Sequence, residues 1–222
     1  MNLLAIDTSS DNCSLGILWN DKVRLDYNRF KPRSASELFA YLDKSLRRLK
    51  LDFKKFDALV LGAGPGSFTG LRISFAAAKA WSLAIDLPVI TVGSFASIAY
   101  RFKHQQEKIA VVADARRGLI YGATYLAKGG VLRREKKETL ISLEDFIRDK
   151  KTYFFVTYDT ALRDAALGLE PGLRFHGQDV FPNAKSLIFL AAGLYSAKKF
   201  TPLDKLQPLY LHPKTCQIRK KV

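Results

Sequence analysis

Cysteine is scarce in this chain, which has 222 residues and only two cysteines, Cys13 and Cys216. Two cysteines this far apart do not form the disulfide framework of a small secreted domain, and they favour a reducing compartment. Long apolar runs are also missing, since none approaches the roughly 20 residues of a membrane-spanning helix. The N-terminus has no basic region followed by an apolar stretch, so no signal peptide is predicted. We therefore expect a cytoplasmic protein in which Cys13 is a small core residue.

Histidine is scarce as well, and the three histidines, His104, His176 and His212, are far apart in the sequence. None pairs with a second histidine or a cysteine at the spacing of metal ligands, so no metal site is predicted. No Gly-x-Ser-x-Gly stretch supports a serine hydrolase. No Gly-Lys-Ser or Gly-Lys-Thr follows the glycine-rich stretch, which excludes a P-loop. A dinucleotide fingerprint is disfavoured, because no acidic residue ends a neighbouring parallel strand at the required distance.

Acidic residues are too few to balance the basic ones. The chain has 21 Asp and Glu against 36 Lys and Arg, a net charge of +15. The basic residues cluster at 47–50, Lys54-Lys55, Arg133-Arg134, Lys136-Lys137 and Arg219-Lys220-Lys221. A positive field of this size attracts RNA or an acidic partner, and a solvated surface without a specific ligand is the equal alternative. No aromatic residues are interleaved with these clusters in a stacking pattern.

The two halves of the chain show the same order of elements. In the first half we expect strands at 2–7, 12–19, 22–27 and 58–61, a helix after a capping box of Ser34 and Glu37, and a helix after residue 72. In the second half we expect strands at 108–113, 119–126, 131–137 and 153–156, and helices at 143–148, 160–167 and 184–198. Each half therefore has the order βββαβα, with the later elements of the second half reduced.

This repeat predicts an α/β protein with the duplicated fold of actin, sugar kinases and the heat-shock chaperone ATPases. We predict two domains, residues 1–101 and residues 102–222. Asp7 and Asp114 then occupy equivalent places, each at the end of a first strand. In active ATPases of this fold such carboxylates handle the metal and phosphates of the nucleotide, and the alternative is that each only caps the following turn.

The most informative stretch is Gly-Pro-Gly-Ser-Phe-Thr-Gly-Leu-Arg at residues 64–72. It lies between the apolar run 58–61 and a helical run, so we predict a strand–turn–helix junction. Its glycines allow positive φ and close backbone approach, and Ser67 and Thr69 can cap the new helix. Such a helix start can bind an anion, although most glycine turns only reverse the chain.

This stretch resembles the signature of the bacterial TsaB (YeaZ) family, and three other stretches are similar to motifs of that family. They are Leu-Ala-Ile-Asp-Thr-Ser at 4–9, Asp-Ala-Arg-Arg at 114–117 with Tyr121, and Pro-Leu-Tyr-Leu at 208–211. His212 stands where the family usually has an arginine. The resemblance covers nearly the whole chain and implies the actin-like ATPase (ribonuclease H-like) fold.

The resemblance implies a non-catalytic scaffold subunit, required to form threonylcarbamoyladenosine next to the anticodon of tRNA. Such a subunit would bind and activate TsaD, help to recruit TsaE, contact tRNA through the complex and form a homodimer when isolated. The family makes its partner contacts with its first two helices. The partner-binding residues implied here are Leu38, Tyr41, Gly70, Arg72, Ser74, Ala77 and Ala78. The small residues among them, with Ala84, form a ridge that permits close helix contact, unless they pack internally against the sheet.

No active site is expected. In the catalytic paralogue TsaD the resemblance implies two metal-binding histidines one turn apart on the first helix, and residues 34–41 here contain none. The second half also offers no glycine-rich phosphate turn. We expect at most a vestigial nucleotide or anion site, formed by Asp7, Thr8, Gly64, Gly66, Ser67 and Asp114. No cofactor is expected in the isolated chain, and ATP or ADP binding is left open for the assembled complex. Two alternatives stay open: a small ATP-dependent kinase or ATPase of this fold, and a tRNA-binding module.

Overall fold

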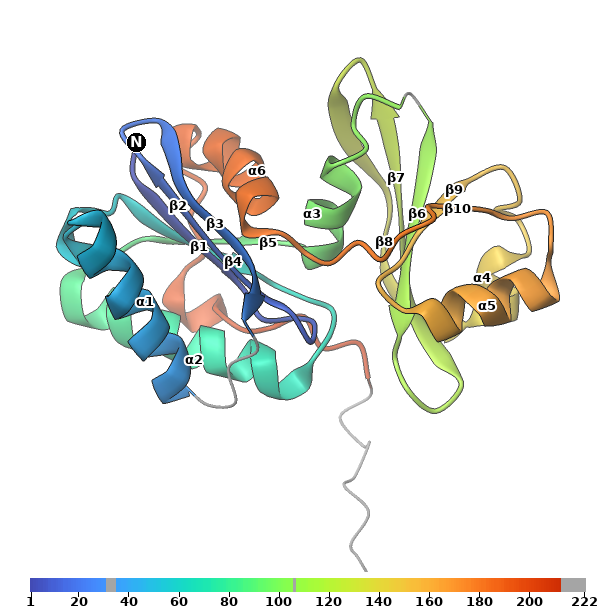
Figure 1. The fold of residues 1–222 in the computed structure, drawn as a ribbon, viewed down its shortest axis with the longest axis horizontal. Coiled ribbons are helices and arrows are strands. Elements are labelled where there is room, and N and C mark those ends of the chain that lie inside the picture. The colour runs from blue at the N-terminus through green and yellow to red at the C-terminus, as the bar shows by residue number, and fades with distance from the viewer. Residues whose placement is uncertain (31–34, 106, 213–222) are drawn as a thin grey trace, which may run out of the picture.

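Two five-stranded sheets organise the computed structural model, which describes residues 1–30, 35–105 and 107–212. Figure 1 shows the two sheets side by side, each with helices packed around it. The first sheet has the strand order β3-β2-β1-β4-β5, with β1 (Leu3–Asp7), β2 (Cys13–Trp19), β3 (Lys22–Phe30), β4 (Ala58–Gly62) and β5 (Val89–Val92). The second has the order β10-β9-β6-β7-β8, with β6 (Lys108–Asp114), β7 (Leu119–Lys128), β8 (Val131–Ser142), β9 (Phe154–Val156) and β10 (Arg174–Phe175).

The helices of the described residues differ widely in length. They are α1 (Ala35–Leu49), α2 (Phe68–Ile85), α3 (Ser94–Tyr100), α4 (Leu143–Ile147), α5 (Thr160–Leu169) and α6 (Ala184–Ser196), with the short 3-10 helices η1 (Phe53–Lys55) and η2 (Leu203–Lys205). None of the helices in this part of the chain is long and apolar enough to cross a membrane.

The two sheets share one topology. The first strand of each sheet runs antiparallel to the second and parallel to the fourth, as β1 does with β2 and β4, and β6 with β7 and β9. Counted within each half, both sheets have the order third, second, first, fourth, fifth. The predicted duplicated actin-like fold is therefore confirmed. Asp7 and Asp114 each end the first strand of their sheet, as the repeat predicts.

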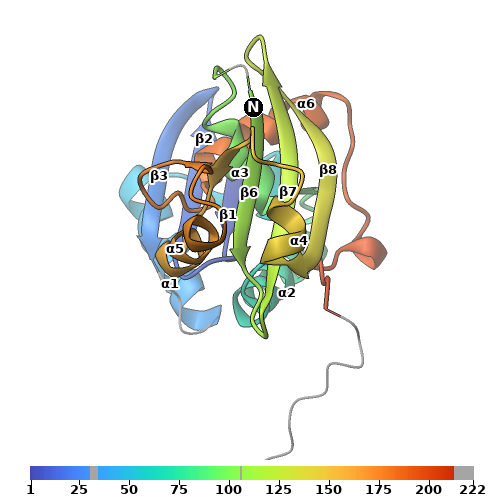
Figure 2. The same cartoon turned by 90° about the vertical axis from the view of Figure 1, so that its right-hand side faces the viewer.

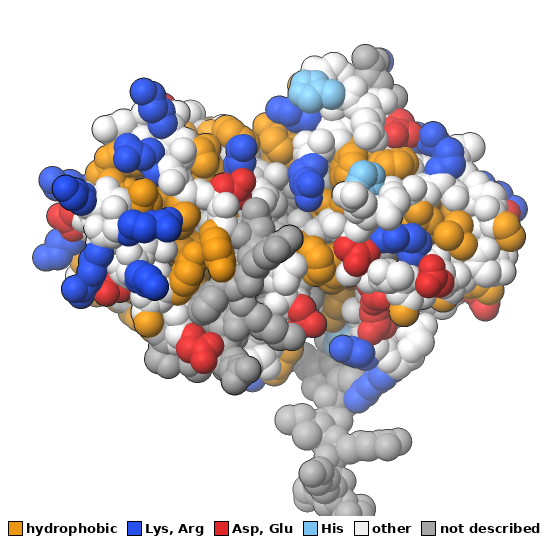
Figure 3. Space-filling model, viewed as in Figure 1, with side chains coloured by type: hydrophobic (Ala, Val, Ile, Leu, Met, Phe, Trp, Pro, Cys, Tyr) orange, Lys and Arg blue, Asp and Glu red, His pale blue; other side chains and the backbone are white. Residues whose placement is uncertain are grey.

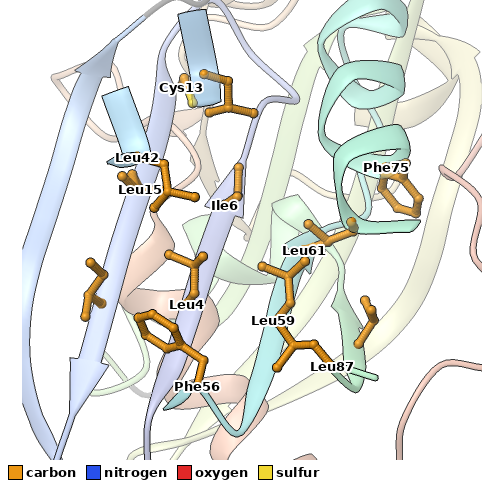
Figure 4. Packing of buried hydrophobic residues seen from close by; sticks show 14 of the residues in the cluster. Leu4, Ile6, Cys13, Leu15, Leu42, Phe56, Leu59, Leu61, Phe75 and Leu87 are labelled. Atoms are coloured by element: carbon orange, nitrogen blue, oxygen red, sulfur yellow. The ribbon is translucent and has the colours of Figure 1, made fainter. Parts of the chain in front are cut away.

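The first sheet is covered on both faces, and its central strands β1 and β4 are buried along their whole length. Leu4 and Ile6 point to the face covered by α1 and α2, where they join the cluster drawn in Figure 4. Leu3 and Ala5 point to the opposite face, where they pack against Leu187 of α6. The period of two along a strand places alternate residues in two separate cores.

The second half is smaller. α4 and α5 cover the outer face of its sheet, as Figure 2 shows, and α3 packs on the inner face through Phe95 and Ile98. α4 has 5 residues and α5 has 10, whereas α1 has 15 and α2 has 18. The predicted reduction of the second half is confirmed.

The C-terminal part of the chain returns to the first sheet. α6 packs on β1, β2 and β4, and the segment after it joins the sheet edge through a 2.7 Å hydrogen bond from Thr201 N to Val89 O. Residues 102–222, the second predicted domain, therefore supply one helical layer of the first. A division at residue 101 separates the two sheets but not their helices, and it remains a proposal about folding units.

Two strands, one α-helix and the two short 3-10 helices were missed by the sequence prediction. β5 and β10 have only 4 and 2 residues, and α3 is buried over most of its surface, so none has a clear amphipathic period. Ser34 and Cys216 lie outside the described residues. Cys13 is buried, as predicted, and burial raises the pKa of its thiol to about 12.

Candidate functional site

The segment between β4 and α2, residues 63–67, packs against the end of β1, and we call it the glycine turn. Its Gly64–Pro65 peptide bond is cis, and Gly66 has a φ of +154°. A Cβ at Gly66 would lie 1.9 Å from the backbone oxygen of Ser9, and a Cβ at Gly70 would lie 2.0 Å from that of Thr8. Glycine is required at both positions because backbone meets backbone there.

The backbone donors of this turn bind groups within the chain. Gly64 N donates to Ser94 Oγ at 3.0 Å, and Ser67 N donates to Ser9 O at 2.7 Å. Ser67 is the N-cap of α2, and its Oγ accepts from Gly70 N at 3.2 Å. The predicted capping role of Ser67 is confirmed. These three N–H groups are occupied in the chain as it stands, and anion binding at the turn stays a prediction.

Asp7 is fully buried beneath the turn. Its Oδ1 accepts hydrogen bonds from Ser9 N at 2.8 Å and Ser9 Oγ at 2.6 Å, whereas Oδ2 has no hydrogen-bond partner among the described residues. A Cβ at Gly62 would lie 1.9 Å from Oδ2, so a glycine covers this atom. Burial raises the pKa of Asp7, and the hydroxyls of Ser9 and Ser94 oppose that rise.

The predicted vestigial site is only partly brought together. Asp7, Thr8 and the glycine turn form one connected group, since Thr8 Oγ1 lies 2.8 Å from both Gly70 O and Ser74 Oγ. Asp114 is exposed, and it binds Arg116 through a 2.9 Å hydrogen bond to its backbone N–H and a 3.4 Å ion pair. No hydrogen bond within the described ranges joins Asp114 to Asp7.

The C-terminal segment meets the glycine turn. Leu209 N donates to Ala63 O at 2.9 Å. The Tyr210 ring lies 5.3 Å from the ring of Phe68, and its hydroxyl accepts from Arg72 Nε at 3.4 Å. The Arg72 guanidinium lies 3.6 Å from the centre of the Phe68 ring. The motifs at 64–72 and 208–211 therefore form one surface.

The same segment reaches the second half through His212. Its Nε2 lies 2.9 Å from Ala115 O, and its ring packs edge-on against Tyr121 at 5.8 Å. The motif at 114–117 and Tyr121 is thus joined to the other two. The four stretches that carry the family resemblance, including 4–9 with Ser9 bound to Ser67, are far apart in sequence, and the fold brings them together.

Comparison with known proteins gives the same family. The chain is 33% identical to "tRNA threonylcarbamoyladenosine biosynthesis protein TsaB" of Haemophilus influenzae over 95% of this chain and 93% of that protein. The chain belongs to the TsaB (YeaZ) family. It is also 28% identical to TsaB of Escherichia coli over 95% of this chain and 94% of the relative. The family described as "TsaD: tRNA N6-adenosine threonylcarbamoyltransferase" matches residues 31–169. YeaZ from Pseudomonas aeruginosa has the same fold, with a TM-score of 0.80 and 24% identity over 94% of this chain and all of that one.

The ridge of small residues predicted on α2 needs a correction. Ser74, Ala77 and Ala78 are buried within the chain, and so is Leu38 on α1. Their small side chains let α2 lie close to the first sheet, which is the internal packing that the sequence left open. These four side chains were predicted to contact a partner, but they are not exposed. A bulky residue at Ser74 would test the core rather than an interface.

Arg72 and Ala84, which were also predicted for the partner surface, are exposed and lie on another stripe of α2. It consists of Arg72, Ala76, Lys79, Ala80, Leu83 and Ala84. Leu83 is 76% exposed, and Phe39 of α1, 36% exposed, packs edge-on against Trp81 at 5.1 Å. We call this stripe together with Phe39 the α1–α2 face. The sequence periodicity of α2 does not indicate which side is buried, because alanines occur on both the buried and the exposed side.

The basic clusters are scattered in the structure as in the sequence. Lys54 and Lys55 are exposed on η1, whereas Arg134 and Lys136 lie on the edge strand β8 and pair with Glu138 and Asp149. The cluster at 219–221 lies outside the described residues. No group of three or more metal-binding side chains is found in the part of the chain that the structure describes.

Proposed function

We propose that this chain is a non-catalytic scaffold subunit, required to form threonylcarbamoyladenosine next to the tRNA anticodon. It binds and activates TsaD and helps to recruit TsaE. The observation that carries the proposal is the contrast at α2. Its first turn packs against Thr8, next to the fully buried Asp7 whose carboxylate a phosphate-transferring relative would use, while its outer face presents Leu83 to solvent. The carboxylate is therefore buried, whereas an apolar surface on α2 is exposed and available for contact with a partner.

The partner is argued from the family match. The residues matched to the TsaD family, 31–169, include both α1 and α2. If TsaD has equivalent helices, it can occupy the place that a second copy of this chain would take in a two-fold dimer. The α1–α2 face would then serve both a homodimer of the isolated chain and the heterodimer with TsaD, and the two would compete. The recruitment of TsaE, the contact with tRNA and the cytoplasmic location are proposed from the family resemblance.

An ATP-dependent kinase or ATPase is the weaker candidate. Magnesium is held by ionised carboxylates that the metal can reach. Asp7 is fully buried and its pKa is raised, both of which oppose metal binding. Nucleotide binding at the interface with a partner stays open, because that site would include residues of the other protein.

Leu83→Glu tests the interface. A carboxylate on this exposed residue leaves the fold intact but places a charge in the proposed contact, so we expect the affinity for TsaD to fall at least tenfold, about 1.4 kcal/mol. Leu169→Glu is the matched control, since Leu169 is 49% exposed at the end of α5 in the second half. The measurement is co-purification and titration of each variant with TsaD. Normal binding by Leu83→Glu, or equal loss in the control, would contradict the proposed face.

A further inference from the structure

A second surface lies on the other side of the first sheet from the α1–α2 face. It is a groove of about 750 Å³ between α3, α6 and the segment that crosses from the second half to α6. Its lining includes Tyr100, Arg101, Lys103, Phe181, Lys185 and Phe189. In Figure 3 the surface is hollowed between the two lobes at the top of the view, with basic and apolar side chains close together. We call it the α3–α6 groove.

The groove offers flat aromatic surfaces from two directions. Phe189 of α6 is 44% exposed, and its ring stacks on Tyr100 of α3 at 6.2 Å with 26° between the planes. Phe181, on the crossing segment, stacks on Tyr158 at 5.4 Å and 20°. Each ring packs against a second ring, which restricts its orientation before anything binds. Fixed aromatic faces are the surfaces on which unpaired bases stack.

Three basic side chains, Arg101, Lys103 and Lys185, line the groove. Arg101 and Lys185 are exposed, and Lys103 Nζ lies 2.8 Å from the Tyr100 hydroxyl. None of the three forms an ion pair within the described ranges.

The acids in the lining are different, because both are engaged inside the chain. Asp179 is paired with Arg163, and Asp26 accepts from Asn183 Nδ2 at 3.3 Å. Even with the charge of Asp26 counted in full, the three cations leave the groove with a net positive charge. His176 nearby agrees with this: its pKa is lowered by burial and then by the charges of Arg101 and Arg163.

We propose that the α3–α6 groove binds unpaired nucleotides of an RNA, with bases stacked on Phe189 and Phe181 and phosphates on Arg101, Lys103 and Lys185. The inference rests on the proposed function and deepens it, since it places a tRNA contact on this chain. An acidic segment of a protein would satisfy the cations but would leave the stacked rings without a role. Because α6 and the α1–α2 face lie on opposite sides of the first sheet, RNA and TsaD can bind together.

The test uses the full chain and two labelled RNAs: an anticodon stem-loop, and the same stem closed as an uninterrupted duplex. The first variant combines Arg101→Gln, Lys103→Gln and Lys185→Gln. Its control combines Lys54→Gln, Lys55→Gln and Lys128→Gln, which removes the same charge from exposed lysines that do not line the groove. We expect the groove variant to bind the stem-loop at least tenfold more weakly and to lower the salt slope by about two units, at roughly 0.7 per phosphate contact. The control should change both only slightly.

Phe189→Ala tests the stacking. We expect about a tenfold loss of stem-loop binding and little change for the duplex, whose bases are not free to stack. Leu169→Ala is its control for the loss of an exposed apolar side chain, and circular dichroism checks that each variant is folded. Equal losses in groove and control variants, unchanged binding, or displacement of the stem-loop by an acidic peptide at lower concentration than by RNA would each overturn the inference.

Failure of this inference is distinguishable from failure of the proposed function. If tRNA modification by TsaD and TsaE requires the chain but the groove variants bind RNA normally, only the inference fails. If modification does not require the chain while the groove variants lose RNA binding, the scaffold proposal fails and the groove stands.

Discussion

The ends of β1 and β6 occupy the same place in the two halves, but they are built differently. Asp7 is buried under a glycine turn whose backbone touches residues 8 and 9. Asp114 is exposed and pairs with Arg116, and a Cβ at Gly118 in the turn after it would meet nothing within 4 Å. The two halves thus share one strand order, but in the first half the glycine turn next to Asp7 is closely packed and leads into the long helix α2. In the second half, where the helices are shorter, the turn after Asp114 is exposed and loosely packed at Gly118.

The largest expected effect comes from adding one methyl group to each turn. Gly66→Ala places a Cβ 1.9 Å from the backbone oxygen of Ser9, which also accepts the hydrogen bond from Ser67 N. The backbone must shift to admit it, so we expect a loss of about 3 kcal/mol or more in the free energy of unfolding. Gly118→Ala meets no neighbour, and its φ of +73° alone should cost about 1 kcal/mol. Urea unfolding of both variants measures the difference. Equal losses would show that the first turn is not closely packed as described.

A smaller effect should appear when the two carboxylates are neutralised. Burial raises the pKa of Asp7 above its ordinary 3.8, so the folded chain holds this proton more tightly than the unfolded chain does. Stability contributed by the protonated form is then present below pH 3.8 and is lost as the pH rises through the higher folded pKa. Asp7→Asn should remove this loss while its amide oxygen can still accept from Ser9. We expect the variant to gain stability over wild type as the pH rises toward neutrality.

Asp114→Asn is the control for that experiment, because the side chain is exposed and should change stability by less than about 0.5 kcal/mol. The measurement is the free energy of unfolding of all three proteins at a series of pH values. A difference between Asp7→Asn and wild type that does not change with pH would contradict the raised pKa.

Most of the strands and the glycine turn could be predicted from the sequence because their signals are local. Apolar runs and the Ser67 cap each depend on neighbours in the chain. The destination of α6 could not be predicted in this way, since a helical apolar pattern does not say which sheet it covers. The burial of Ser74 and Ala78 was ambiguous because small residues occur on both sides of α2.

The α3–α6 groove was missed because its parts come from distant segments. Tyr100, Arg101 and Lys103 lie on one segment, and Phe181 and Phe189 lie some 80 residues later in the numbering. The alternation Tyr-Arg-Phe-Lys at 100–103 was a visible signal. This pattern indicates a binding surface only once the structure shows that Phe102 is buried and that Tyr100, Arg101 and Lys103 line a groove.

The central claim is that the chain supports TsaD through a surface and not through its Asp7 site. The most direct measurement is threonylcarbamoyl transfer to tRNA by TsaD and TsaE, with no added chain, with wild type, with Leu83→Glu and with Asp7→Asn. We predict that transfer requires the chain, is lost or strongly reduced with Leu83→Glu, and is retained with Asp7→Asn. Transfer that survives Leu83→Glu but disappears with Asp7→Asn would contradict the account, because the buried carboxylate would then be the functional group.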